Sequence, residues 1–282
     1  MSTPADLPAP GAPRQAASGQ QQSPDRPRPG CLWLIPVPLD PASDPLSILP
    51  HQTLQVLRHL EHFVAERPRS ARAVLKAVGI DRPLQSVAIA ELSEHTPEAA
   101  LPALLAPLLA GHEVGLLSEA GCPAVADPGA KLVELAHRHA IPVRPLVGPS
   151  SLLLALMGSG LNGQRFAFAG YLPQEPEALT RQILALEERS RVHGETELFI
   201  ETPYRNQRLF DALLSRLAPS TRLLVAAALT TPLEQIDCRS IQAWRRHQEP
   251  LARVPTVFGL LAEGQSRATP HRSAQRRLRQ PS

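Results

Sequence analysis

The sequence predicts an α/β protein made of two successive α/β domains. Apolar runs of four or five residues alternate with stretches in which apolar residues recur every three or four positions, over residues 31–157 and again from residue 164. This alternation is typical of strands connected by helices. Two of the apolar runs end in turns of small residues, at 118–129 and 148–151. Because ligands of open α/β sheets bind outside the carboxyl ends of strands, these turns indicate a binding site.

The composition narrows the function classes. The 282 residues carry a formal net charge of +3, and all but two of the basic residues are arginine, Lys76 and Lys131 being the exceptions. Arginine suits phosphate and carboxylate recognition, although codon bias alone also explains this usage. Three scattered cysteines are too few for a disulfide framework or a zinc site, so no metal is expected.

No apolar stretch is long enough to span a membrane, and the first residues lack the order of a signal peptide, so we expect a cytosolic protein without a membrane partner. Residues 1–30 are rich in Pro, Gln and Ser and are expected to be disordered. Residues 265–282 form a basic tail with five arginines, which is either a solvated end or an electrostatic contact for nucleic acid.

The first domain is expected to span residues 31–163. Apolar runs predict strands at 31–35, 86–90, 114–117 and 142–147, with a possible strand at 63–65. Apolar spacing predicts helices at 70–78, 96–111, 130–139 and 152–157. Pro102 and Pro107 should kink the second of these helices.

The second domain is expected to span residues 164–264. Its predicted strands are 166–169, 197–200, 223–229, 234–237 and 256–261. Its predicted helices are 175–189, 207–217 and a short one near Trp244. The same alternation of strand and helix therefore occurs twice along the chain.

Five short motifs follow one another in a defined order. They are residues 36–38 (PVP), 118–123 (SEAGCP), 126–129 (ADPG), 147–149 (VGP) and 170–173 (GYLP). Together they resemble motifs of the tetrapyrrole methylase superfamily, and most of all those of the ribosomal RNA small-subunit methyltransferase I family. The resemblance covers roughly residues 32 to 262.

The resemblance implies two α/β domains with a cofactor cleft between them, S-adenosyl-L-methionine as the methyl donor, and a homodimer. The family methylates a cytidine ribose 2′-hydroxyl of 16S ribosomal RNA, so RNA is the implied partner. Positions that match the family's cofactor site, partly through their backbone, are Pro38, Ser118, Glu119, Ala120, Gly121, Ser150, Ser151, Glu201, Thr202, Leu229, Thr230 and Thr256. Gly121 should leave room for the cofactor against the backbone. Ser150 and Thr202 are equally well explained as helix caps.

Glu66 and Arg69 are the candidate catalytic residues on the acceptor side. A ribose hydroxyl is a very weak acid, so a carboxylate base would assist the transfer, and a nearby arginine would favour its charged form. A surface ion pair at a helix start explains the two residues equally well. Arg205 could bind a phosphate or pair with Glu201 or Asp211.

The chain departs from the family motifs at several positions. Residues 66–69 read ERPR where the family has EDTR, and residues 201–206 read ETPYRN. Glu119 and Cys122 replace Asp and Thr in the central loop. The departures suggest a paralogous branch, and three functions stay open: methylation of ribosomal RNA, methylation of a tetrapyrrole or other small molecule, and cofactor or RNA binding without catalysis. Fold alone does not choose among them.

Overall fold

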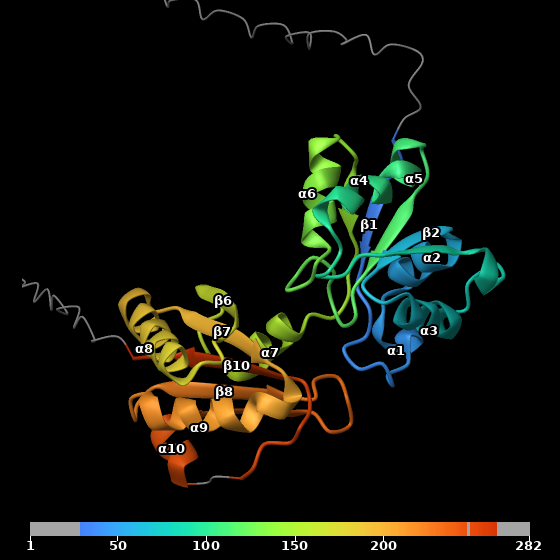
Figure 1. The fold of residues 1–282 in the computed structure, drawn as a ribbon. Coiled ribbons are helices and arrows are strands. Elements are labelled where there is room, and N and C mark those ends of the chain that lie inside the picture. Colours follow the sequence, from blue (N-terminus) through green and yellow to red (C-terminus); the bar gives the residue numbers. More distant parts are fainter. Residues whose placement is uncertain (1–28, 247–248, 264–282) are drawn as a thin grey trace, which may run out of the picture.

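The computed structural model describes residues 29–246 and 249–263, which form two five-stranded sheets with helices around them (Figure 1). The first sheet lies between Leu32 and Pro145 and the second between Phe166 and Leu261. The basic tail expected at 265–282, and residues 1–28 of the expected N-terminal disorder, lie outside the described residues. The predicted α/β class is confirmed.

The first sheet is parallel throughout. Its strands lie in the order β3-β2-β4-β1-β5. They are β1 (Leu32–Ile35), β2 (His62–Ala65), β3 (Ala88–Glu91), β4 (Val114–Leu117) and β5 (Val143–Pro145). All four residues of the central strand β4 are buried. This is the expected state of a parallel strand that helices cover on both faces.

Helices cover the two faces of this sheet in two groups. The first group packs around Ile35 and Phe63 and comprises α1 (Pro45–Ile48), α2 (His51–His59) and α3 (Pro68–Val78). The second group packs around Leu32 and Leu116 and comprises α4 (Leu101–Leu104), α5 (Ala106–Leu109) and α6 (Ala130–Arg138). The chain therefore leaves β1 toward one face and leaves β4 toward the other. Since β1 and β4 are neighbours, their carboxyl ends form a topological switch point, where open α/β sheets bind ligands.

The second sheet is mixed and has the order β6-β7-β10-β8-β9. The strands are β6 (Phe166–Tyr171), β7 (Thr196–Glu201), β8 (Arg222–Ala227), β9 (Gln235–Ser240) and β10 (Thr256–Leu261). One face packs against α8 (Pro176–His193), α9 (Asn206–Arg216) and α10 (Ile241–Arg246). Only β6 and β7 are parallel to each other; the other pairs are antiparallel.

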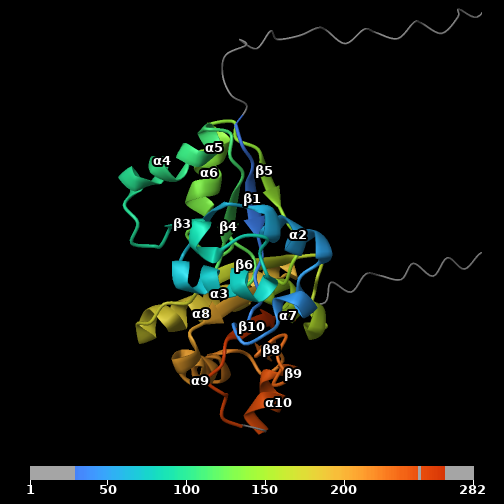
Figure 2. The same ribbon diagram turned by 90° about the vertical axis from the view of Figure 1, so that its right-hand side faces the viewer.

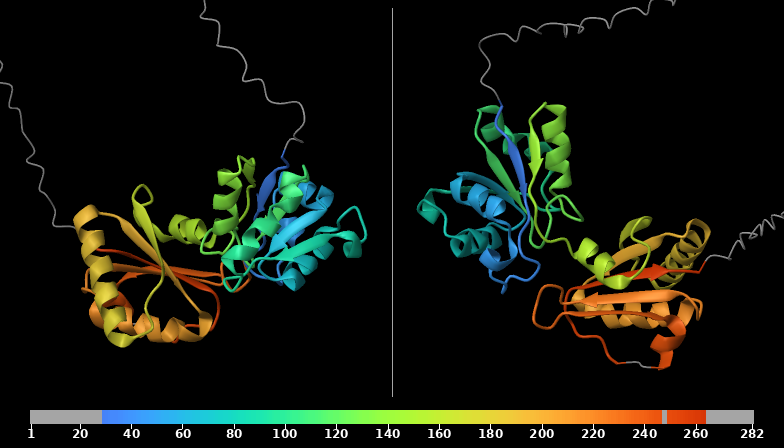
Figure 3. Two further views of the ribbon diagram at one scale, coloured as in Figure 1. Left: turned by 45° about the horizontal axis from the view of Figure 1, so that its top comes forward. Right: turned by 180° about the vertical axis from the view of Figure 1, so that it is seen from behind.

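Helix α7 (Ser151–Ser159) connects the two sheets and lies between them in Figures 1 and 3. Its residues Ala155 and Leu156 pack on the second sheet, against Leu198 and Val257. Leu39, in the loop after β1, joins the same cluster. The loop that follows the first strand thus contacts the apolar face of the second sheet.

Two elements differ from the sequence-based expectation for physical reasons. The helix expected at 96–111 is broken into η2 (Glu98–Ala100), α4 and α5, because each proline lies in the first turn of a new piece, where its missing N–H is tolerated. Strand β8 ends at Ala227 rather than at residue 229, because Ala228 and Thr230 adopt positive φ angles of 49° and 66°. A left-handed residue cannot continue a strand. The short helix α1 was not predicted.

The close packing of Gly115 in β4 gives a prediction. A Cβ at this position would lie 2.8 Å from Cδ1 of Phe63 and 2.9 Å from Cδ1 of Ile35, both in the core. Gly115→Ala should therefore lower the free energy of unfolding by about 1–3 kcal/mol. Gly163→Ala is the control, because nothing lies within 4 Å of a Cβ there. Equal urea midpoints for the two variants would contradict this packing.

Candidate functional site

Three loops meet at the switch point of the first sheet and are bonded to one another. After β1, the N–H of Val37 donates to the carbonyl of Gly121 (2.9 Å), and the N–H of Gly121 donates back to Val37 (3.1 Å). The thiol of Cys122 reaches the carbonyl of Pro149, in the turn after β5, at 3.3 Å. Ser118 donates from Oγ to the carbonyl of Gly121 at 2.8 Å and is buried. The loops after β1, β4 and β5 therefore form one bonded unit.

Small residues make this unit possible. Gly121 has a φ of +70°, and a Cβ would lie 2.9 Å from Cδ2 of Leu39 and 3.3 Å from the carbonyl oxygen of Pro149. A Cβ on Gly148 would collide with the ring of Pro36. The missing Cβ of Gly121 thus makes room for Leu39 and Pro149 of the neighbouring loops, whereas the sequence had led us to expect room for a ligand there. The glycine serves to let the loops approach each other.

The rest of the loop after β4 is folded around Asp127. Its Oδ1 accepts hydrogen bonds from the N–H groups of Ala124 (3.0 Å) and Gly129 (2.7 Å). Ala124 and Ala126 have φ angles of 64° and 53°. Left-handed alanines are strained, and such residues cluster at ligand-binding sites. The ADPG motif therefore maintains a strained loop conformation.

The other first-sheet residues that match the family's cofactor site line the same unit. Pro38 is buried, Glu119 is half-buried and Ala120 is exposed. Ser150 is the N-cap of α7 and accepts from the N–H of Leu153 at 3.5 Å, and the half-buried Ser151 begins the helix. The capping interpretation of Ser150 thus agrees with the geometry.

Carboxylates follow three adjacent strands at this edge. Glu66 comes directly after β2, Glu94 follows β3 and Glu119 follows β4. Burial of Glu66 raises the pKa of its carboxyl group, and the charges of Asp127 and Glu119 raise it further, while Arg67 acts in the opposite direction. Glu66 therefore holds its proton more tightly than an ordinary glutamate.

Glu119 is bonded to the start of α3. Its Oε2 accepts from Oγ of Ser70 at 3.0 Å and lies 3.8 Å from NH1 of Arg67. Arg69, expected to stand beside Glu66, is exposed and makes no ion pair within residues 29–246 and 249–263. The ion pair at this helix start is therefore Arg67–Glu119 and does not involve Glu66 and Arg69.

The second sheet presents its own group of polar residues at the end of β7. Glu201 and Thr256 are register partners and are both buried. Oε1 of Glu201 accepts from the N–H of Thr202 at 2.7 Å, and Oε2 pairs with Arg205. Arg205 thus pairs with Glu201, one of the two partners that the sequence suggested. The carboxylate of Glu201 is already bonded within the chain.

Two buried polar atoms at this edge have no partner within the described residues. They are Oδ1 of Asn206 and Oγ1 of Thr230. Nδ2 of Asn206 donates to Oγ1 of Thr256 (3.0 Å) and to the carbonyl of Val254 (2.8 Å), so the side chain is held in place. Buried polar atoms usually have partners, so two orphans at one edge indicate missing hydrogen bonds.

The two edges approach each other through apolar side chains. Leu39, after β1, and Leu229, after β8, belong to one cluster with Leu156 of α7. In Figures 2 and 3 the carboxyl ends of the first sheet point toward the second sheet, with α7 beside them. The switch-point loops and the segment 228–230 therefore belong to one region of the molecule.

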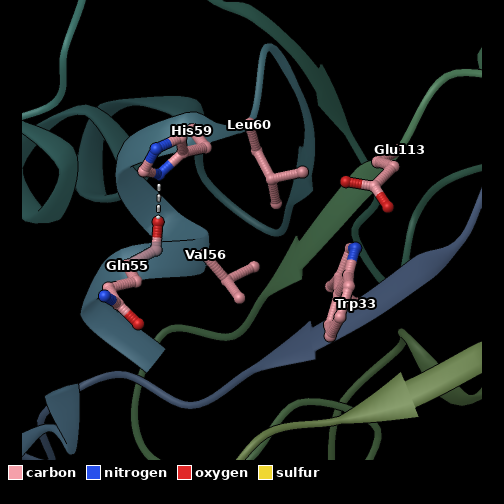
Figure 4. Close-up of a pocket in the computed structure, with 6 residues that line it drawn as sticks. All are labelled: Trp33, Gln55, Val56, His59, Leu60 and Glu113. Atoms are coloured by element: carbon pink, nitrogen blue, oxygen red, sulfur yellow. Dashed lines mark hydrogen bonds between the residues drawn. The ribbon is translucent and has the colours of Figure 1, made fainter. Parts of the chain in front are cut away.

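A cavity of about 280 Å³ lies elsewhere, beside the first sheet (Figure 4). It lies near the amino ends of the strands, beside α2, and is lined by Trp33, Gln55, Val56, His59, Leu60 and Glu113. Glu113 directly precedes β4, so the cavity lies toward the opposite edge of the sheet from the switch-point loops. None of the residues matched to the family's cofactor site lines it.

Comparison with known proteins identifies the family. The chain is 32% identical over 229 residues to the ribosomal RNA small subunit methyltransferase I of Mesorhizobium japonicum, covering 81% of this chain and 74% of that protein. The chain belongs to this methyltransferase family. No family model matches it.

Solved structures agree with this fold. The methyltransferase CobJ superposes with a TM-score of 0.55 at 18% identity, covering 83% of this chain and 94% of that one. Uroporphyrin-III C-methyltransferase from Thermus thermophilus, complexed with S-adenosylhomocysteine, superposes with a TM-score of 0.50 at 20% identity, covering 82% and 97%. The tetrapyrrole methylase fold predicted from the sequence is confirmed.

Sequence reasoning missed several polar residues of the candidate site. Arg67 and Ser70 hold Glu119, Asp127 folds the loop after β4, and Asn206 is buried at the second edge. One signal was available, since acidic residues that directly follow successive parallel strands meet at one edge. The partners of Glu119 depended on where α3 begins, and the sequence placed that start two residues late.

The described part of the chain lacks two features. Within residues 29–246 and 249–263, no helix has the length and apolar character needed to cross a bilayer. In the same residues, no group of three or more His, Cys, Asp and Glu side chains is placed to hold a metal ion.

The raised pKa of Glu66 gives a stability prediction. The folded protein binds this proton more tightly than the unfolded chain, so stability falls as the pH rises from the ordinary glutamate pKa through the raised one. Glu66→Gln should therefore raise the Tm at neutral pH, and the gain should vanish as the pH falls through this window. Glu113→Gln, which changes an exposed carboxylate near the other edge, is the control. A lower Tm for E66Q at neutral pH would contradict the assignment.

Proposed function

We propose that this protein transfers a methyl group from S-adenosyl-L-methionine to a ribose 2′-hydroxyl of small-subunit ribosomal RNA. One observation supports this most directly: the loops after β1 and β4 are hydrogen-bonded at the switch point of a parallel sheet. Such a point is the usual ligand site of the fold. Membership of the ribosomal RNA small subunit methyltransferase I family supports the RNA acceptor.

The residues present fit this cofactor. The first edge offers Pro38, Ser118–Gly121 and the turn 150–151, held in place by hydrogen bonds among the loops. The second edge offers Thr202 and the segment 229–230, where Oγ1 of Thr230 has no partner among the residues that the structure describes. A ligand with several polar groups would satisfy such atoms. S-adenosyl-L-methionine, when bound, supplies a methyl group on a positively charged sulfur that is open to in-line displacement.

Glu201 and Thr256 serve this site by holding the second edge in position. The carboxylate of Glu201 is bonded to Arg205 and to Thr202, and Oγ1 of Thr256 donates to the carbonyl of Val254 at 2.9 Å. These bonds fix the end of β7 and the start of β10. A bound cofactor would therefore contact Thr202 and the backbone of these two segments. Because these groups are held in place, the methyl group and its acceptor can be kept in the geometry needed for attack.

Glu66 is the proposed general base. The reaction forms a bond between the ribose oxygen and the methyl carbon, breaks the bond between that carbon and sulfur, and releases the hydroxyl proton. Glu66 can accept that proton, and its raised pKa brings it closer to the neutral range in which general bases are most efficient. Arg69, in the first turn of α3, is exposed and is proposed to contact the acceptor strand.

We further propose that the two α/β domains, residues 31–163 and 164–264, act together in a homodimer. Large apolar side chains are exposed near α7, with Val147 at 71% and Met157 at 80% exposure. Exposed apolar groups of this kind are often covered by a partner subunit. Light scattering at micromolar protein should give about twice the 30.5 kDa chain mass. A monomer across a dilution series would contradict this part of the proposal.

Methylation of ribosomal RNA tests the function. RNA from a strain that lacks the gene is incubated with the protein and S-adenosyl-L-methionine, and its nucleosides are analysed by mass spectrometry. We expect a new 2′-O-methylated nucleoside in 16S ribosomal RNA. Glu66→Gln should reduce the rate about 10²- to 10⁴-fold, because a positioned general base contributes that much. The wild-type rate should rise with pH as Glu66 loses its proton.

The control and the contrary outcomes are specific. Glu113→Gln should keep the wild-type rate, and calorimetry with S-adenosylhomocysteine should show that E66Q still binds the cofactor product. If the protein methylates a tetrapyrrole but not RNA, the acceptor is a tetrapyrrole and the proposed RNA acceptor is wrong. Binding of the cofactor without transfer to any acceptor would indicate a protein that has lost catalysis.

A further inference from the structure

The exposed face of α3 carries a row of cations. Arg69, Arg72 and Lys76 are spaced by three and four residues and are all exposed, while Ala71 and Leu75 face the core. Residues three and four apart lie on one face of a helix, so the three side chains form a stripe about 10 Å long. The helix contains no acidic residue.

These cations are free of ion pairs within residues 29–246 and 249–263. Some exposed arginines on other helices pair with a carboxylate of their own helix, as Arg138 does with Glu134 and Arg181 with Glu177. The stripe of Arg69, Arg72 and Lys76 has no such neutralising partner. Acidic neighbours would cancel the electric field of these cations. Without them, the row of positive charge attracts a polyanion.

The stripe leads away from the proposed catalytic edge. Helix α3 begins at Pro68, two residues after Glu66, and Ser70 in its first turn bonds Glu119 of the loop after β4. Figure 1 shows α3 beside α1, and the two helices pack in the same core cluster on one face of the first sheet. The N-terminus of the helix adds positive potential at the end nearest to Glu66.

We propose that the stripe of Arg69, Arg72 and Lys76 binds successive phosphates of the RNA strand whose ribose is presented to Glu66. This inference rests on the proposed function. The carboxylates Glu66, Glu94, Glu119 and Asp127 repel phosphates, and the cations of α3 attract them. The strand is thereby oriented with its phosphates along the helix and a sugar hydroxyl toward the acids. Phosphate contacts of this kind set the register of a nucleic acid without reading its sequence.

Salt-dependent RNA binding tests the stripe. The variant Arg72→Gln/Lys76→Gln leaves the proposed catalytic pair intact, and its binding to transcribed 16S ribosomal RNA is measured over a series of salt concentrations. Each lost phosphate contact should lower the slope of log affinity against log salt by about 0.7 to 0.9. At 0.1 M salt the two losses together correspond to about 25- to 60-fold weaker binding.

The matched control is Arg216→Gln/Arg246→Gln, which removes two exposed arginines from the helices of the second sheet. It changes the net charge equally and should keep the wild-type affinity and slope. Arg72→Lys retains the charge and should bind nearly as well as wild type. All variants should bind S-adenosylhomocysteine with unchanged affinity.

The outcomes separate this inference from the proposed function. If the wild type methylates RNA and the α3 variant binds RNA as well as the control does, the stripe does not bind RNA phosphates. The proposed methyltransferase function is then still supported. If both double variants weaken RNA binding equally, the loss of net charge alone explains the effect. That result would also contradict phosphate binding by the stripe. If the wild type binds no RNA, the RNA acceptor and the stripe both fail. If the stripe binds an acidic protein and not RNA, the proposal that it binds RNA phosphates is likewise wrong.

Discussion

The pair of backbone hydrogen bonds between Val37 and Gly121 is the contact on which the site depends. It joins the loops after two neighbouring parallel strands at the place where the chain departs toward opposite faces of the sheet. The turn after β5 closes on the same pair through Cys122 and Pro149. Because Gly121 has a positive φ and a tightly filled surrounding, a side chain there would separate all three loops.

Charge divides the surface around this unit into two parts. Carboxylates from three strand ends converge near Glu66, and one of them, Glu119, is held by Ser70 and Arg67. The raised pKa of Glu66 reflects a destabilising arrangement that packing elsewhere must offset, which is common where acids take part in catalysis. The adjacent helix carries only positive charge. A phosphate-bearing acceptor would therefore be attracted to the helix and turned away from the acids.

The sequence was sufficient for most of the fold, and it pointed to the same strand ends that carry the candidate site. Alternating apolar runs predicted the strands, and the small-residue turns after β4 and β5 indicated which strand ends would form a site. What it could not show depends on long-range contacts. The partner of Glu119 is decided by the packing of α3, and the filled space beside Gly121 is decided by Leu39 and Pro149. The early end of β8 results from left-handed backbone at Ala228, which composition does not reveal.

A crystal structure of the protein with S-adenosylhomocysteine tests the central claim most directly. The account predicts that the ligand lies between the bonded loops 36–40 and 118–121 and the segment 228–230, with its sulfur toward Glu66 and a new hydrogen bond to Oγ1 of Thr230. Loss of the Val37–Gly121 hydrogen bonds on binding, or a ligand seated in the cavity beside Trp33, would contradict it.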